Sequence, residues 1–236
     1  MKAFVITLSH IPESLKTGQQ TLAKLQEFGL DAQLWEGTYG HEVESIFSQE
    51  GRTLNPISFK GVPVDDEYRS MCSRLGVMGC FYSHYRLWKL CAELNEPILI
   101  FEDDALLHRE FIPVEWRDVL LLATGKNVHI LDFYKEKLEN PVGPPMAVNP
   151  KGKVMPGAVG YGLTPRGARK LTAYYDKTYL PADNAMNTMV VKLQCHSHLM
   201  GRAATEKDGK VSLTKSKMWI KMRDSDRKST RLNSSH

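Results

Sequence analysis

Three consecutive carboxylates, Glu102, Asp103 and Asp104, are the residues of this 236-residue chain whose types and spacing point most directly to chemistry. They follow a short apolar run, residues 97–101, whose length and boundaries predict a buried strand. Because α/β sheets place their ligands at the carboxyl ends of strands, the acids fall where a site is expected. Packed carboxylates repel one another unless a cation separates them, and hard oxygen ligands suit Mg²⁺ or Mn²⁺. The triplet therefore predicts a divalent-metal site that carries a diphosphate, or, as the plainer alternative, a solvated acidic turn that caps the next element.

Two other groups of residues could take part in a site. Ser83 and His84 are adjacent on a helix predicted over residues 75–94, so their side chains do not face each other and they are not a nucleophile-base pair by themselves. Gly160 lies in a Gly-x-x-Gly-x-Gly pattern that is placed inside a strand, which is unlike a dinucleotide fingerprint. Close approach of a ligand or of a neighbouring element explains these glycines equally well. The chain has no Walker A sequence and no G-x-S-x-G sequence, which disfavours the simplest ATPase and hydrolase functions.

The elements that would position these residues alternate between strands and helices. This alternation predicts an α/β three-layer domain with a largely parallel sheet. Residues 135–156 contain five prolines and predict a long surface loop of the kind that forms active-site lids, and residues 55–69 predict a second loop. Apolar periodicity predicts strands over 2–8, 32–35, 97–101, 127–133 and 157–164, and helices over 12–28, 41–49, 75–94, 114–123, 165–175 and 183–193.

Composition limits the class of protein. A hydrophobic content of 42% is typical of a soluble globular domain. The formal charge of +4 is mildly basic, which suits an anionic ligand such as a nucleotide-sugar or an acidic glycan but is too small to demand nucleic acid. We expect one domain over 1–225. The polar segment 226–236 resembles a reading frame of a DNA-sequencing adapter, which predicts a non-native tail. There is no run of about 20 apolar residues and no signal-peptide pattern at the start, so we expect no transmembrane segment. The four cysteines form no C-x-x-C pair. We therefore expect a cytoplasmic protein that is in peripheral contact with the inner membrane at most.

Two motifs in order along the chain carry a resemblance to a known family. Residues 79–88 contain the pattern Gly-Cys-x-x-Ser-His-x-x-x-Trp, and residues 100–104 contain an apolar strand that ends in Glu-Asp-Asp. Together they resemble glycosyltransferase family 25, which includes lipooligosaccharide galactosyltransferases and collagen galactosyltransferase domains. The similarity extends to the first strand, to the glycine-rich segment 160–168 and to the Pro-x-Asp step at 181–183, and so covers roughly residues 2–200.

The resemblance implies a GT-A-like single domain and a UDP-hexose donor. It implies that Asp104 and Glu102 hold a divalent metal, Mn²⁺ or Mg²⁺. It also implies that transfer of the sugar inverts the configuration at the anomeric carbon. Asp183, which follows Pro181 at a helix start, is the candidate catalytic base, with Asp103 and Asp132 as the next candidates. We expect Glu102, Ser83, His84 and Gly160 to bind the donor, although Ser83 and His84 serve equally well as packing residues of their helix.

Three functions stay open at this point. The favoured one is a glycosyltransferase that moves galactose or glucose to a hydroxyl of a surface-glycan precursor, as in lipopolysaccharide biosynthesis. A less favoured one has the same chemistry on a hydroxylated base of phage DNA, for which the chain lacks a clustered basic stripe. The third is a non-catalytic sugar-binding domain of the same fold.

Overall fold

The computed structural model describes residues 1–52, 74–124, 146–147, 157–195 and 198–204. Residues 1–203 form one compact unit. The predicted strand over 127–133 with Asp132, the loop over 55–69, nearly all of the loop over 135–156 and the polar tail over 226–236 lie outside the described residues. The domain end at 225 therefore stays a prediction.

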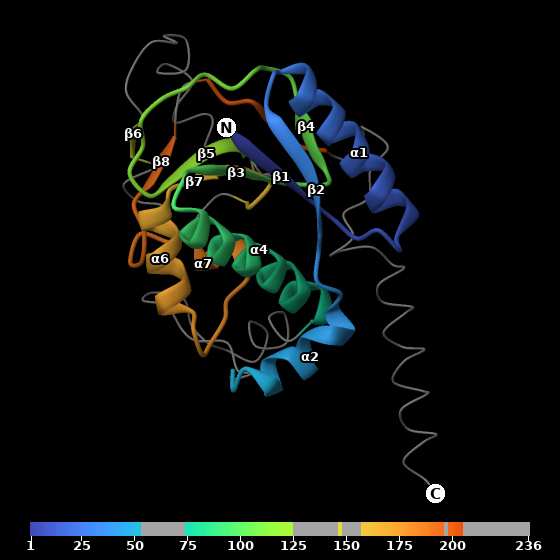
Figure 1. The fold of residues 1–236 in the computed structure, drawn as a ribbon, viewed down its shortest axis with the longest axis vertical. Coiled ribbons are helices and arrows are strands. Elements are labelled where there is room, and N and C mark those ends of the chain that lie inside the picture. Colours follow the sequence, from blue (N-terminus) through green and yellow to red (C-terminus); the bar gives the residue numbers. More distant parts are fainter. Residues whose placement is uncertain (53–73, 125–145, 148–156, 196–197, 205–236) are drawn as a thin grey trace, which may run out of the picture. The chain divides into compact units, whose positions relative to one another are not determined.

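A nine-stranded mixed sheet forms the centre of this unit (Figure 1). Its main path follows the order β2-β1-β3-β7-β5-β8-β6, and β9 pairs with both β4 and β5 beside that path. The pairings orient six strands, β1, β2, β3, β5, β8 and β9, in one direction and the other three against it, so the predicted mostly parallel α/β sheet is confirmed. The strands are β1 (Lys2–Thr7), β2 (Asp31–Glu36), β3 (Ile98–Glu102), β4 (Ala105–Leu107), β5 (Val119–Thr124), β6 (Met146–Ala147), β7 (Gly160–Leu163), β8 (Leu193–Cys195) and β9 (Gly201–Ala203).

Helices cover both faces of the sheet, because its central strands are apolar on both faces. Alternate residues of β3 enter different cores: Ile98 and Ile100 join one hydrophobic cluster, whereas Leu99 and Phe101 join the other. Helix α1 (Pro12–Glu27) covers the second cluster with Leu25, while α2 (Gly40–Gln49), α4 (Leu75–Leu94), α6 (Pro165–Tyr174) and α7 (Ala182–Ala185) lie on the side of the first. The domain therefore has the three layers that the sequence predicted.

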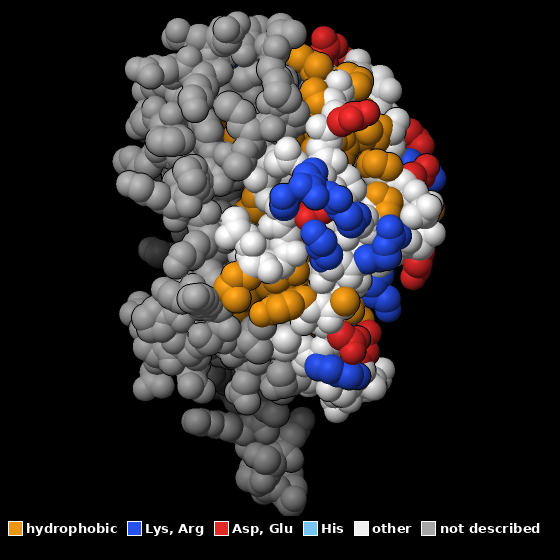
Figure 2. All heavy atoms as spheres, turned by 90° about the vertical axis from the view of Figure 1, so that its left-hand side faces the viewer, with side chains coloured by type: hydrophobic (Ala, Val, Ile, Leu, Met, Phe, Trp, Pro, Cys, Tyr) orange, Lys and Arg blue, Asp and Glu red, His pale blue; other side chains and the backbone are white. Residues whose placement is uncertain are grey.

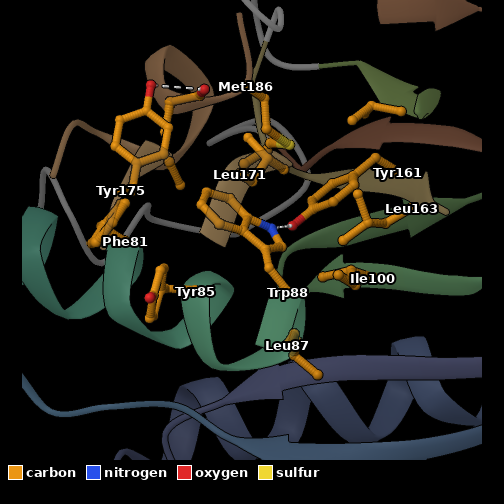
Figure 3. Close-up of a cluster of buried hydrophobic side chains, with 14 of the residues drawn as sticks. Phe81, Tyr85, Leu87, Trp88, Ile100, Tyr161, Leu163, Leu171, Tyr175 and Met186 are labelled. Atoms are coloured by element: carbon orange, nitrogen blue, oxygen red, sulfur yellow. Dashed lines mark hydrogen bonds between the residues drawn. The ribbon is translucent and has the colours of Figure 1, made fainter. Parts of the chain in front are cut away.

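Helix α4 is the largest contributor to the first core. Ten of its residues are buried. Among them, Phe81 packs against Tyr175, and Trp88 packs against Tyr175 and Tyr161 of β7 (Figure 3). The helix ends at Leu94, and the next residue, Asn95, caps it with a φ of 53°, the left-handed conformation that closes helices. None of the helices among the described residues is long and apolar enough to cross a membrane.

Asp118 fixes the junction of β5, α6 and β8. Its side chain is fully buried and its carboxylate bonds Arg166 Nε at 2.8 Å, Lys170 Nζ at 2.7 Å and the backbone N–H of Lys192 at 2.9 Å. These donors outweigh the cost of burial and lower the pKa of the Asp118 carboxyl. Basic side chains gather on the side of the molecule where α6 lies (Figure 2).

Two predicted helices differ from the structure. The second half of the helix expected over 114–123 lies in strand β5, because the run Val119 to Ala123 is buried on both faces of the sheet. A continuous apolar run does not distinguish a buried strand from a helix. The helix expected over 183–193 is only the four-residue α7. Asn187 ends it early, since its side chain donates to the carbonyl of Asn184 and accepts from the N–H of Met189 and thereby competes with helical hydrogen bonds.

Candidate active site at the end of strand β3

The acidic triplet lies at the carboxyl end of β3, near the middle of the sheet. Glu102 is the last residue of the strand, and Asp103 and Asp104 form the turn to β4. The backbone N–H of Glu102 donates to the carbonyl of Val159 at 2.9 Å, which ties the strand end to the segment before β7. The hydroxyl of Thr21 on α1 lies 3.3 Å from the carbonyl of Asp103 and 3.0 Å from that of Ala105, so α1 fixes the turn. All three acids are partly buried, which is a more enclosed position than that of a solvated cap.

Helix α4 brings two further side chains to Glu102. Cys80 and His84 are one turn apart, so they lie on the same face of the helix. His84 Nε2 is 3.3 Å and Cys80 Sγ is 3.7 Å from the same oxygen, Oε1, of Glu102. The three groups thus form a compact Cys-His-Glu cluster whose polar atoms all lie within 4.8 Å of one another.

A buried hydrogen-bond chain continues from His84 into the core. His84 Nδ1 is 2.8 Å from the Tyr161 hydroxyl, and Trp88 Nε1 donates to the same hydroxyl at 2.8 Å. The imidazole also stacks on the Tyr161 ring, with centroids 5.7 Å apart and an interplanar angle of 29°. Figure 3 shows Trp88 and Tyr161 pointing toward each other between α4 and β7.

Asp183 reaches this site from α7. Its Oδ1 accepts the backbone N–H of Asn184 at 2.9 Å, while the Tyr175 hydroxyl, 3.0 Å from the carbonyl of Ala185, holds the short helix in place. Burial, followed by repulsion from the Glu102 carboxylate, raises the pKa of Asp183 above its usual value. The Glu102 carboxylate, which is 81 positions away in the sequence, therefore lies near enough to affect the Asp183 carboxyl.

The pKa of the Cys80 thiol is affected by the same group of negative charges. Burial raises its pKa well above the usual value, and the carboxylates of Glu102, Asp183 and Asp104 raise it further. Because a thiolate is the reactive form of cysteine, Cys80 is unsuited to be a nucleophile here. It acts instead as a neutral donor to Glu102.

These charges favour a cation at the site. The three charges with the largest effect on Cys80 are all negative, and a divalent ion among carboxylate oxygens would relieve their repulsion. Glu102 and Asp104 offer the hard oxygen ligands that Mg²⁺ and Mn²⁺ prefer, so the residues present fit such an ion.

Ser83 and Gly160 are placed by packing with their own neighbours. The buried Ser83 hydroxyl donates to the carbonyl of Gly79 at 2.7 Å and accepts the N–H of Thr38 at 2.8 Å, which joins α4 to the segment after β2. A β-carbon on Gly160 would lie 2.7 Å from the Phe101 ring and 2.9 Å from Ala123 Cβ, so the two neighbouring strands require a glycine there. Of the two explanations that the sequence left open for each residue, these contacts favour packing.

An aromatic group lies at the same edge of the sheet. The parallel strands β1, β2 and β3 end together, with Thr7 opposite Glu36 and Ile6 opposite Glu102. Just beyond them, the ring of Tyr39 lies 4.5 Å from that of His10 and 4.8 Å from that of His41. Aromatic faces at this edge could stack on a planar base.

The structure therefore brings together most of the predicted site residues. His84 and the Cys80 thiol contact Glu102, and Asp104 and Asp183 lie near enough to raise the pKa of that thiol, whereas Asp103 contributes contacts through its backbone in the adjoining turn. Sequence reasoning missed Cys80, Tyr161 and the Tyr39 group as site residues. Only Cys80 carried a signal, because it lies four residues before His84 on a predicted helix.

The family and sequence comparisons agree on one class, the glycosyltransferases and their inactive relatives. Residues 1–115 match the model of glycosyltransferase family 25 (LPS biosynthesis protein), which confirms the resemblance carried by the helix and triplet motifs. One relative is the probable inactive glycosyltransferase 25 family member 3 of Rattus norvegicus, which is 28% identical over 80% of this chain and 32% of its own length. Another is the procollagen galactosyltransferase 1-A of Xenopus laevis, which is 30% identical over 44% of this chain and 16% of its own length.

This chain thus spans about a third of the length of the first of these relatives. Among solved structures, mouse xyloside xylosyltransferase 1 in its apo form is 11% identical, with a TM-score of 0.33, over 80% of this chain and 67% of that one.

Proposed function

We propose that this protein is a metal-dependent, inverting glycosyltransferase that moves a hexose, galactose or glucose, from a UDP-sugar to a hydroxyl acceptor. The observation that carries the proposal is the convergence of Glu102 and Asp104 from the end of β3 with Asp183 from α7. The match of residues 1–115 to family 25 supports it independently.

The donor would bind at the carboxyl end of β3. Glu102 and Asp104 would hold the divalent ion, which supplies the positive charge that stabilises a leaving diphosphate. The rings of Tyr39, His10 and His41 lie beyond the ends of β1 and β2, where they would stack on the uracil base. Ser83 and Gly160 would contribute indirectly, by holding the strand ends and the segment after β2 in place.

Asp183 would be the catalytic base. Its raised pKa makes its carboxylate a better proton acceptor than an exposed aspartate. It would take the proton from the acceptor hydroxyl as the hydroxyl oxygen attacks the anomeric carbon from the face opposite the diphosphate. Asp103, in the adjoining turn, is the alternative base.

The acceptor we propose is a surface-glycan precursor of the lipooligosaccharide type, handled in the cytoplasm. Support comes from the description of the matched family as an LPS biosynthesis protein and from the described cysteines Cys80 and Cys91, which are thiols.

A non-catalytic sugar-binding domain is the second candidate, because some relatives are named as inactive members of the family. The two candidates differ in turnover and not in binding. The test is UDP release from UDP-galactose, UDP-glucose and their N-acetylated counterparts, with Mn²⁺ and with EDTA, alongside UDP affinity measured by calorimetry. Bound UDP without any turnover would favour the second candidate.

The variant Asp183→Asn tests the base. Asparagine keeps the hydrogen bond to Asn184 but loses the basic oxygen, so we expect unchanged UDP affinity and a transfer rate about 10²–10⁴-fold lower. Asp176→Asn is the matched control, since this aspartate is exposed and contacts only Lys177 at 4.0 Å among the ion pairs of the described residues. Normal turnover of Asp183→Asn would show that the Asp183 side chain only stabilises the first turn of α7 and would move the search for the base to Asp103.

A further inference from the structure

We propose that the buried chain Trp88–Tyr161–His84 is a positioning device that fixes Glu102 for donor binding. The kinetic part of this inference rests on the proposed function, in which Glu102 holds the metal and the diphosphate. The hydrogen-bond chain itself follows from the geometry alone and can be tested without any ligand.

The direction of each hydrogen bond follows from the indole of Trp88. Indole N–H is a donor only, so the Tyr161 oxygen accepts from Trp88 Nε1 at 2.8 Å. The hydroxyl hydrogen of Tyr161 is then left for His84 Nδ1, also at 2.8 Å, which makes Nδ1 the acceptor. The imidazole hydrogen must therefore lie on Nε2, which points at Glu102 Oε1 at 3.3 Å. Each donor in the chain finds one acceptor.

The opposite tautomer would leave two groups without partners. With hydrogen on Nδ1, the Tyr161 oxygen would accept from both Trp88 and His84, and its own hydrogen would have no acceptor among these three groups. The lone pair of Nε2 would then face the Glu102 carboxylate. Trp88, Tyr161 and His84 are fully buried, so water cannot replace the lost partners, and a buried polar group without a partner is costly.

This tautomer also excludes His84 from the role of a metal ligand. A metal would bind the Nε2 lone pair, but Nε2 carries hydrogen and donates to Glu102. The Cys80–His84–Glu102 cluster has the composition of a metal centre, yet its geometry is that of two donors bound to one oxygen. The divalent ion is therefore left to the carboxylates.

The consequence for Glu102 is that its two oxygens have different roles. Oε1 is held by His84 and by the Cys80 thiol, whereas Oε2 has no partner among the described residues. The Glu102 side chain keeps 27% exposure, enough to reach a ligand. The Trp88–Tyr161–His84 hydrogen-bond chain thus holds Oε1 of Glu102 and thereby directs Oε2 toward the ligand. Such an arrangement preorganises a carboxylate for binding.

The first experiment determines the tautomer in the ligand-free protein. A ¹⁵N-¹H spectrum of the imidazole rings, assigned by comparison with His84→Gln, should show hydrogen on Nε2 of His84. Hydrogen on Nδ1 would overturn the proposal. The tautomer is read from the wild-type protein and the measurement needs no activity.

The second experiment uses Tyr161→Phe, which keeps the ring but removes the hydroxyl. We expect UDP-Mn²⁺ affinity to fall about three- to tenfold, as for the loss of a net hydrogen bond, and KM for the UDP-sugar to rise by a similar factor with kcat little changed. Cys91→Ala is the matched control. Cys91 lies on α4 and its Sγ bonds the carbonyl of Leu163 on β7 at 3.4 Å, so it joins the same two elements without contacting Glu102.

A double-mutant cycle separates positioning from general destabilisation. If Tyr161 acts through Glu102, Tyr161→Phe should cost no further affinity in a Glu102→Gln background. Equal losses in both backgrounds, or an equal loss in Cys91→Ala, would overturn the positioning role. A wild-type protein that has the Nε2–H tautomer but neither binds UDP nor turns over UDP-sugar would overturn the proposed function and this role together. A wild-type protein that is active but has the Nδ1–H tautomer would overturn the positioning role alone.

Discussion

Gly160→Ala is the sharpest test of whether a glycine at the candidate site serves packing or ligand binding. A β-carbon there would lie 2.7 and 2.9 Å from two atoms of the Phe101 ring and 2.9 Å from Ala123 Cβ. Carbon atoms in contact prefer about 3.5–4.0 Å, so neighbours on both flanking strands would have to move by several tenths of an ångström. Phe101 and Ala123 are fully buried opposite Gly160 in the register of β3 and β5, which leaves little room for relief.

Overpacking of this kind costs about 1–3 kcal/mol, which lowers Tm by roughly 3–10 °C in a domain of this size. Urea unfolding measures the free energy of unfolding, and calorimetry with UDP measures binding by the remaining folded protein. Gly76→Ala is the control: a β-carbon at Gly76, in the first turn of α4, meets nothing within 4 Å, so stability should stay equal or rise by up to about 1 kcal/mol. Unchanged stability of Gly160→Ala with weakened UDP binding would refute the packing explanation and restore Gly160 as a donor contact.

Three further variants test other parts of the site and its support. Ser83→Ala should lower stability by about 1–3 kcal/mol, because the buried N–H of Thr38 loses its acceptor, while UDP affinity stays constant; weaker UDP binding at normal stability would indicate a direct donor contact. Asp118→Asn should lower stability by about 1–3 kcal/mol at pH 7, after discounting for the half-exposed Arg166 and Lys170. Because the pKa of Asp118 is lowered in the folded state, its contribution to stability is complete above the unfolded value near 3.9 and is lost as pH falls through the folded pKa. Urea unfolding should therefore show that the wild type exceeds Asp118→Asn in stability by less in acid than at pH 7. A stability difference that does not change with pH would contradict this. Asp183→Asn should raise Tm at pH 7, because a pKa that is raised in the folded state means that the ionised carboxylate opposes folding. Calorimetric scans at pH 7 and pH 4 should show this rise in Tm only at the pH where wild-type Asp183 is ionised.

Local sequence patterns predicted the parts of the fold that have strong periodicity. Helices α1, α2, α4 and α6 and strands β1, β2, β3 and β7 occur within a few residues of the predicted boundaries. Strand β5 was predicted as a helix, since only its position between β7 and β8 explains why Val119 to Ala123 is apolar on both faces. The antiparallel direction of β7 between β3 and β5 is likewise a property of the sheet and has no local signal.

The candidate site was predictable to a smaller extent. The acids after β3 were visible because they interrupt an apolar run, and Asp183 was visible through the Pro-x-Asp step. The sequence could not show that Cys80 and His84 bind the same oxygen of Glu102, because that contact depends on how α4 crosses the sheet. Nor could it show that Tyr161, 77 positions after His84, fixes the imidazole tautomer.

The position of β3 in the sheet has a consequence for how the chain folds. Ile98 pairs with Lys2 on one side and with Leu163 on the other, so the central strand joins segments that are 96 residues before it and 65 residues after it. Loops of this length slow folding, and the site cannot assemble on the ribosome before β7 has emerged. A fragment cut after residue 115, where the family match ends, would leave β3 as an open edge and Leu99 and Phe101 without their partners from β7. Such a fragment should aggregate when expressed alone, because an apolar strand with an unpaired edge recruits other strands.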